Sequence, residues 1–231
     1  MTIKRPAGVS PKTYLALHLA VGVAVAALGF WAFAGLIDGV LENAAFVHWD
    51  ISAAAWIHAR TSPVGLRVFD LITQLGSPTA MIALGTAGAF VIWRKRQHIL
   101  LIAWVAAFVG GALVDFIVKE SVRRARPAFG TAYLHGHTYS FPSGHAMGST
   151  IGYGMLVYMS VLAWPAGSRA RRIAIAAGIL FVAAVGVSRI YLGVHYPSDV
   201  IGGYVAGAAW LAVCISGVEI ARSESRRPAP R

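Results

Sequence analysis

Three short stretches of this chain bring together residue types that can handle a phosphate group. They contain three permanent cations, two histidines, one carboxylate and a serine followed by a glycine. The stretches are Lys119-x6-Arg126-Pro127, Pro142-Ser143-Gly144-His145 and Ser188-Arg189-x5-His195-x3-Asp199. Ammonium and guanidinium groups bind phosphate oxygens, and imidazole titrates near neutral pH. The set could therefore hold a phosphoryl group, attack it through one histidine and protonate the leaving oxygen through the other.

The cations of the first stretch follow an apolar run. Lys119 ends that run, and Arg126 comes seven residues later in a short basic loop, where Pro127 disfavours a continuing helix. A guanidinium can bind two phosphate oxygens at once, so we predict that this stretch binds phosphate. Positive residues also flank membrane spans for reasons of topology alone. Arg123 and Arg124 fit only that second explanation, and we expect them to contact lipid headgroups.

The second stretch opens another apolar run and has the pattern of a helix start. Ser143 is a suitable N-cap residue, and Gly144 would let a ligand approach the backbone. The first turn of a helix offers N–H groups without intrahelical acceptors, at the positive end of the helix dipole. We expect these groups to bind the phosphate and His145 to point at it. An ordinary capped helix start at a membrane surface is the alternative.

The third stretch links the last two apolar runs. Arg189 ends the fifth run and supplies the third cation. Pro197 disfavours a regular helix through 195–199, because the residue before a proline avoids the helical region. We therefore predict His195 in the entry loop and Asp199 in the first turn of the last helix. A carboxylate there would orient the imidazole and stabilise its charged form. A surface histidine beside a helix-start aspartate is the alternative.

The composition indicates a membrane protein. The chain is 57% hydrophobic and only 13% charged, which is unusual for a water-soluble domain. About 20 apolar residues cross the hydrocarbon core as a helix. Six runs approach or exceed that length, and the fifth is completed by extending it to about 169–190. They are roughly 14–37, 71–93, 99–118, 143–164, 173–187 and 200–218.

The basic residues are distributed as expected for such a protein. The chain carries a net charge of +11, which by itself would suggest a nucleic-acid partner. With six spans and the N-terminus inside, however, 13 of the 20 Lys and Arg residues fall in cytoplasmic segments, and three of the others belong to the stretches above. This positive-inside bias predicts a multi-pass protein of the cell (inner) membrane. Both termini would be cytoplasmic, the three stretches extracytoplasmic, and no nucleic acid would bind.

The predicted fold class is all-α, with six transmembrane helices and one interfacial helix. Residues 42–60 are too polar to cross, but Trp49, Trp56 and Arg60 recur at helical spacing, which predicts an amphipathic helix in the outer interface. We divide the chain into a cytoplasmic tail (1–13), a membrane domain (14–220, with its motif core at about 70–218) and a second tail (221–231).

Glycines repeat every four residues in two of the spans. They are Gly144, Gly148 and Gly152 in the fourth span, and Gly203 and Gly207 in the sixth. Small residues at this spacing let helices approach closely in lipid. We expect packing within the chain, and a homodimer through the same helix faces is the alternative.

The three stretches together resemble the three-part signature of the type 2 phosphatidic acid phosphatase superfamily, and every signature position holds the expected residue type. The resemblance implies a metal-independent phosphatase without a cofactor. It implies that His195 attacks phosphorus to form a phosphohistidine and that Asp199 orients His195. His145 would protonate the leaving oxygen and later help to activate water. The residues that would bind the phosphoryl oxygens are Lys119, Arg126, Ser143, Gly144 and Arg189.

The signature defines the reaction better than the substrate. A site at the membrane surface suits a lipid phosphate whose tail stays in the bilayer, so membrane lipids and a lipid phosphate are the expected partners. The resemblance implies undecaprenyl diphosphate, phosphatidic acid and phosphatidylglycerol phosphate as candidates, with the first preferred. A phosphotransferase that passes the phosphoryl group to a second lipid is an alternative. A membrane transporter or scaffold is another, but it leaves the cluster of histidines and cations unexplained.

Overall fold

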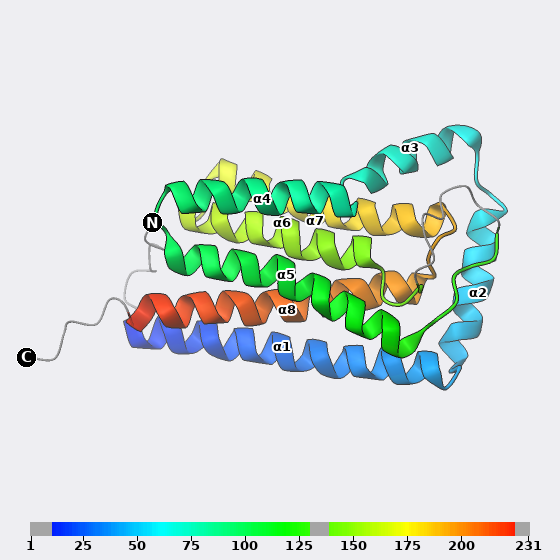
Figure 1. Ribbon diagram of the computed structural model, residues 1–231, viewed down its shortest axis with the longest axis horizontal. Coiled ribbons are helices and arrows are strands. Elements are labelled where there is room, and N and C mark those ends of the chain that lie inside the picture. Colours follow the sequence, from blue (N-terminus) through cyan, green and yellow to red (C-terminus); the bar gives the residue numbers. More distant parts are fainter. Residues whose placement is uncertain (1–10, 130–138, 225–231) are drawn as a thin grey trace, which may run out of the picture.

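The computed structural model describes residues 11–129 and 139–224, which form eight helices and no strands. In chain order they are α1 (Pro11–Leu41), α2 (Ala45–His58), α3 (Pro63–Gln74), α4 (Pro78–Arg94), α5 (His98–Val122), α6 (Gly144–Ala163), α7 (Arg169–Tyr191) and α8 (Pro197–Glu224). The long helices lie side by side, and α2 lies across one end of the bundle (Figure 1). The all-α prediction is confirmed.

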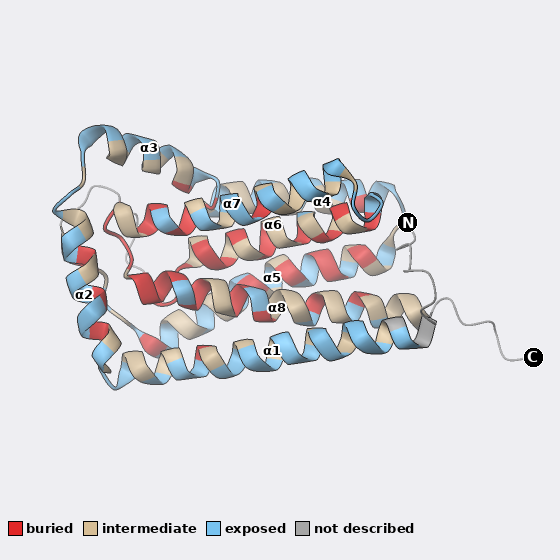
Figure 2. Ribbon diagram, turned by 180° about the vertical axis from the view of Figure 1, so that it is seen from behind, coloured by how far each residue is buried: buried red, intermediate tan, exposed pale blue. Residues whose placement is uncertain are grey.

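The centre of the bundle is α6, which packs against α5, α7 and α8, while α1 packs along α8. In the most apolar 18-residue stretch of α6, 50% of the residues are buried, whereas only 6% are buried in the corresponding stretch of α1. Figure 2 shows the same contrast, with many buried residues on α6 and few on α1. The elements that carry the second and third stretches therefore lie at the core of the molecule.

Six segments are long and apolar enough to cross a membrane, as the sequence predicted. They are Leu15–Leu41, Pro63–Arg94, His98–Val122, Gly144–Ala163, Arg169–Tyr191 and Pro197–Ser223. Large apolar side chains cover their outer faces, among them Trp31, Ile102 and Leu180. Such a surface is stable against lipid tails and unfavourable in water. The chain is therefore a membrane protein.

The second span is broken between α3 and α4. Ser77 accepts the N–H of Ala80 and Pro78 is the first residue of α4, which is the serine-proline pattern typical of a helix start. The sequence did not separate α3 from α4, because α3 continues the apolar run. Gly76 lies at the break, where a Cβ would approach Val185 of α7 and the carbonyl oxygen of His145. The broken span is thus packed against the helix that carries His145.

The glycine repeats are used inside the chain. A Cβ on Gly203 would lie 2.6 Å from the carbonyl oxygen of Ser143, and one on Gly207 would lie 2.9 Å from Cβ of Thr150. Gly148 and Gly152 face Met81 of α4. Close packing of α8 and α4 on α6 accounts for these glycines. The homodimer stays a prediction that these contacts do not test.

The ends of the membrane domain lie close to the predicted boundaries. The first helix begins at Pro11 and the last ends at Glu224, a few residues outside the predicted limits of 14 and 220. The predicted tails fall largely on residues 1–10 and 225–231, which lie outside the described part of the chain. The division into domains stays a prediction.

Candidate active site

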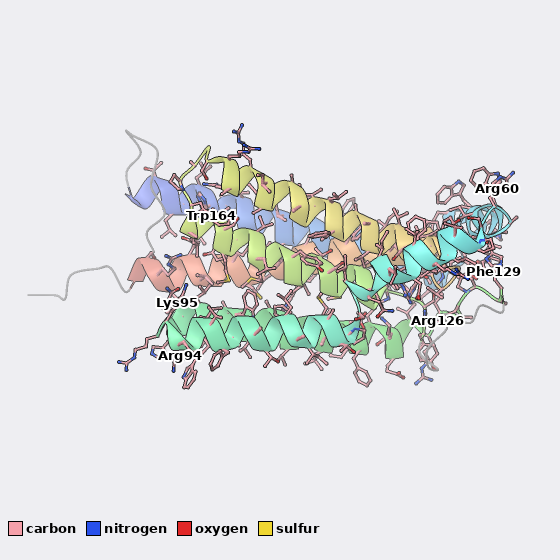
Figure 3. All side chains as sticks on the ribbon, turned by 90° about the horizontal axis from the view of Figure 1, so that it is seen from above. Arg60, Arg94, Lys95, Arg126, Phe129 and Trp164 are labelled. Atoms are coloured by element: carbon pink, nitrogen blue, oxygen red, sulfur yellow. The ribbon has the colours of Figure 1, made fainter. Side chains whose placement is uncertain are left out.

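The three stretches meet at one end of the bundle. Lys119 lies in the last turn of α5, Arg189 in the last turn of α7, and Asp199 in the first turn of α8. Figure 3 shows Arg126 and Phe129 at the end that also holds Arg60, with Arg94, Lys95 and Trp164 at the other. The site therefore lies at the end of the bundle that α2 crosses.

Hydrogen bonds connect the three stretches directly. The Nζ of Lys119 donates to the carbonyl oxygen of Pro142 at 2.6 Å, which joins the first stretch to the second. The N–H of Ser143 donates to the carbonyl oxygen of Asp199 at 2.9 Å, which joins the second to the third. The Nη1 of Arg126 donates to the carbonyl oxygen of Val194 at 2.9 Å, which joins the first to the third. The three stretches thus form one connected site.

The contacts of His195 define its tautomer. The loop between α7 and α8 holds this residue, as predicted, and its side chain is 2% exposed. Nη1 of Arg126 lies 3.1 Å from its Nε2. A guanidinium only donates, so Nε2 must accept and the ring proton is on Nδ1. Nδ1 lies 3.4 Å from Oδ2 of Asp199 and makes no hydrogen bond within the described residues. A neutral imidazole with a lone pair on Nε2 is the form a nucleophile requires.

Burial also favours the neutral form of this histidine. Burial lowers the pKa of His195 to about 3, while the neighbouring Asp199 acts in the opposite direction and Arg126 adds to the lowering. The folded protein therefore keeps His195 uncharged through the whole range near neutral pH. Near neutral pH, Nε2 therefore already has its lone pair, and no proton has to be removed from it before the attack.

His145 lies in the first turn of α6 and shares the site with the cations. It lies close enough to the permanent cations Arg189 and Arg126 for their charges to act on it. Ser143 is the N-cap and its Oγ accepts the N–H of Ala146 at 3.5 Å, so the expected cap is confirmed. The N–H groups of Gly144 and His145, the first two residues of the helix, have no intrahelical acceptors and can bind an anion.

Two of the cations are held by protein groups and keep donors for a ligand. Lys119 pairs with Asp115 at 2.5 Å and bonds the Pro142 carbonyl, which uses two of its three protons. Arg189 is buried, and its Nη1 donates to Oγ1 of Thr73 at 2.9 Å. Its Nε is buried without a hydrogen-bond partner among the described residues. A buried guanidinium with an unused donor is well suited to an anionic ligand.

Packing requires a glycine at position 144, for a reason that the sequence did not reveal. A Cβ at this position would lie 3.0 Å from Oδ2 of Asp115 and 3.4 Å from Nζ of Lys119. The absent side chain therefore makes room for that ion pair. Asp115 and Lys119 are four residues apart in α5, a spacing that places both side chains on the same face of the helix.

The prediction for Arg124 was wrong, because its side chain does not face lipid. α5 ends at Val122, its C-cap Arg123 adopts a left-handed conformation with a φ of 51°, and the next residue turns inward. Arg124 is 8% exposed and donates to Oδ1 of Asp199 at 2.6 Å and to Oδ2 of Asp50 at 2.8 Å. Ser140 also donates to the Asp199 carboxylate. Sequence reasoning missed Arg124 and Ser140 as partners of Asp199, and only the Arg-x-Arg spacing before Pro127 hinted at Arg124.

Comparison with known proteins identifies the family. The family model of the PAP2 superfamily matches residues 98–222. The chain belongs to this superfamily. The PAP2 region contains all eight predicted site residues and excludes α1–α4, so Asp50 and Thr73 lie outside it.

Two relatives and one solved structure of PAP2 proteins illustrate the likeness. Phosphatidylglycerophosphatase B of Bacillus subtilis is 37% identical over 140 residues, which cover 59% of this chain and 66% of that protein. Undecaprenyl-diphosphatase BcrC of Bacillus subtilis is 30% identical over 115 residues, 48% of this chain and 53% of that protein. The crystal structure of a transmembrane PAP2 type phosphatidylglycerolphosphate phosphatase from Bacillus subtilis matches with a TM-score of 0.70 at 26% identity. That match covers 89% of this chain and 98% of the other.

Proposed function

We propose that this protein is a lipid-phosphate phosphatase that works through a phosphohistidine at His195. The observation that carries the proposal is the state of that imidazole. Arg126 donates to Nε2, and Nδ1 is directed to Asp199. Membership of the PAP2 superfamily and phosphatases among its relatives support the reaction class.

In the first step, the lone pair on Nε2 of His195 forms a bond to phosphorus. The bond from phosphorus to the leaving oxygen breaks, and protonated His145 gives that oxygen its proton. The imidazole gains positive charge, which the carboxylate of Asp199 stabilises across Nδ1. Arg126 must leave Nε2 as the phosphate enters, and its guanidinium then binds a phosphoryl oxygen.

In the second step, water attacks the phosphohistidine. Neutral His145 takes a proton from this water, the bond between phosphorus and Nε2 breaks, and inorganic phosphate leaves. Lys119, Arg126 and Arg189, with Ser143 and the N–H of Gly144, hold the phosphoryl oxygens through both steps. Phosphoryl transfer depends mostly on positioning and charge stabilisation. Three fixed cations can supply this charge, so we propose that the reaction needs no metal ion.

The placement of the site favours a lipid substrate. It lies at the end of six apolar spans whose outer faces suit lipid tails, so a tail can remain in the bilayer while the headgroup enters. Likeness to a phosphatidylglycerolphosphate phosphatase over 89% of the chain favours a phosphomonoester on a glycerolipid. Likeness to an undecaprenyl-diphosphatase supports a polyprenyl diphosphate, the substrate preferred from the sequence, as the second candidate. The positive-inside distribution supports an extracytoplasmic site with both termini in the cytoplasm.

Phosphate release from a panel of lipid phosphates tests this function. The detergent-purified protein should release phosphate from phosphatidylglycerol phosphate, phosphatidic acid or undecaprenyl diphosphate, also in the presence of chelator. His195→Ala should be inactive yet still insert into membranes, and His98→Ala, exposed at the other end of the bundle, should be fully active. Activity in His195→Ala would refute the mechanism. Loss of activity in chelator, restored by magnesium, would refute metal independence, and a phosphorylated second lipid as product would indicate phosphotransfer.

A further inference from the structure

The interfacial helix α2 carries a buried carboxylate that the mechanism above does not use. Asp50 is 1% exposed, although α2 lies across the end of the bundle and its neighbour Trp49 is exposed (Figure 1). Burial of a carboxylate is costly unless charge and hydrogen bonds compensate for it. The partners of Asp50 therefore show what this helix contributes.

Among the described residues, the partners of Asp50 belong to the active-site end of α8 and the loop after α5. Oδ1 accepts the N–H of Ser198 at 3.0 Å, so Asp50 caps the start of α8 from another helix. Oδ2 accepts from the Ser198 hydroxyl and from Nη2 of Arg124, the latter at 2.8 Å. Nη1 of Arg124 in turn bonds Oδ1 of Asp199 at 2.6 Å. Asp50 is thus joined to His195 through Arg124 and Asp199.

The charges in this chain of contacts explain why a second carboxylate is useful. Asp199 must keep negative charge to stabilise His195 as that imidazole becomes cationic. Arg124 is buried against Asp199, and on its own this guanidinium would neutralise it. Asp50 shares the guanidinium, so the two carboxylates and one arginine keep one net negative charge beside His195. Arg124 is also fixed by stacking over the Tyr196 ring, with Cζ 4.3 Å from its centroid.

We propose that Asp50 is a positioning residue for the phosphatase reaction, acting through Arg124 to hold Asp199 in place and to preserve its charge. The inference rests on the proposed role of His195. It makes α2 part of the catalytic apparatus, although α2 lies outside the region that matches the PAP2 model. Asp50 is linked to the nucleophile His195 through Arg124 and Asp199.

The decisive variant is Asp50→Asn, which keeps the shape and the hydrogen bond to Ser198 but removes the charge. We expect kcat per active site to fall about 10- to 100-fold, by analogy with the loss of a group that orients a metal-binding side chain. KM should change little, because the groups that bind the phosphate are intact. Glu120→Gln is the matched control, since Glu120 is an exposed carboxylate that pairs with Arg123 at 3.7 Å. It should keep the wild-type kcat.

A double variant separates charge sharing from a purely structural cap. Asp50→Asn with Arg124→Gln removes one charge of each sign and leaves the negative charge of Asp199 unopposed. It should therefore recover part of the kcat that Asp50→Asn loses, in a double-mutant cycle. Active sites are counted by the phosphohistidine that rapid quenching traps, so a loss of folded protein does not count as a loss of kcat.

Two results would overturn the inference. One is an Asp50→Asn protein with wild-type kcat per active site and only a lower unfolding temperature, which would make Asp50 a structural cap. The other is a double variant that loses at least the product of the two single losses, which would exclude charge sharing. If the wild-type protein forms no phosphohistidine at all, the proposed role of His195 fails instead, whatever the Asp50 variants do.

Discussion

His145 and His195 sit in the same cluster of cations but have different proposed tasks. His195 has its Nε2 lone pair fixed by Arg126 and its Nδ1 directed to Asp199. His145 lies in the first turn of α6, within the influence of the charges around it. Local contacts therefore give two identical side chains distinct roles, as nucleophile and as acid and base.

The proposed role of His145 predicts an effect that depends on the leaving group. His145→Gln should lower kcat for a lipid phosphate by about 10²–10⁴-fold, the range for loss of a general acid or base. With p-nitrophenyl phosphate the leaving oxygen needs no proton, so the first step should survive. Stopped-flow measurement should then show a burst of p-nitrophenolate stoichiometric with enzyme, followed by slow turnover. Equal losses of burst and steady rate would assign His145 another role.

The low pKa of His195 predicts acid sensitivity of the fold. The pKa of this side chain is about 3 in the folded protein and about 6.5 when it is unperturbed. Between these values the unfolded chain takes up a proton that the folded protein does not. The free energy of unfolding therefore falls as pH drops through about 6.5 toward about 3. Thermal unfolding in detergent should show a smaller decline with pH for His195→Gln than for the wild type; parallel declines would contradict the assignment.

At the scale of elements, α6 and α8 must approach closely for the site to form. Gly203 makes this possible, because its backbone lies against Ser143, whose N–H bonds Asp199. Gly203→Ala places a Cβ 2.6 Å from the carbonyl oxygen of Ser143, and overpacking of this kind costs about 1–3 kcal/mol. We expect a lower unfolding temperature and lower activity. Gly217→Ala in the same helix, where a Cβ meets nothing within 4 Å, should show neither. Equal behaviour of the two variants would contradict this account.

Helices that depend on local sequence pattern were predicted well from the sequence. Side-chain burial that depends on contacts between distant residues was predicted poorly. The length of the apolar runs predicted six spans, and Ser143 predicted the start of α6. The helix at 42–60 was predicted as well, but not which of its side chains would be buried. Asp50 and Arg124 are 74 residues apart, so neither could be recognised as the partner of the other. Arg123 and Arg124 looked alike in the sequence, and only the turn at Arg123 separates a solvated arginine from a buried one.

For the whole molecule, the positive-inside distribution predicts an orientation that labelling can test. Arg60 and Lys95 are exposed at opposite ends of the bundle (Figure 3). Cys214 is the chain's only cysteine, so Cys214→Ala gives a cysteine-free background. In intact cells, a membrane-impermeant maleimide should label Arg60→Cys and should reach Lys95→Cys only after lysis. Labelling of Lys95→Cys in intact cells would place the site in the cytoplasm.

The central claim is that Nε2 of His195 becomes bonded to phosphorus, and trapping that bond tests it most directly. The wild-type protein is mixed with a radiolabelled lipid phosphate, quenched in alkali within one turnover and mapped by mass spectrometry. We predict an alkali-stable, acid-labile phosphoryl group on His195 that disappears in His195→Ala. It should accumulate in His145→Gln, whose second step is slow, when p-nitrophenyl phosphate is the substrate. Release of phosphate by an enzyme that never carries label on residue 195 would contradict the account.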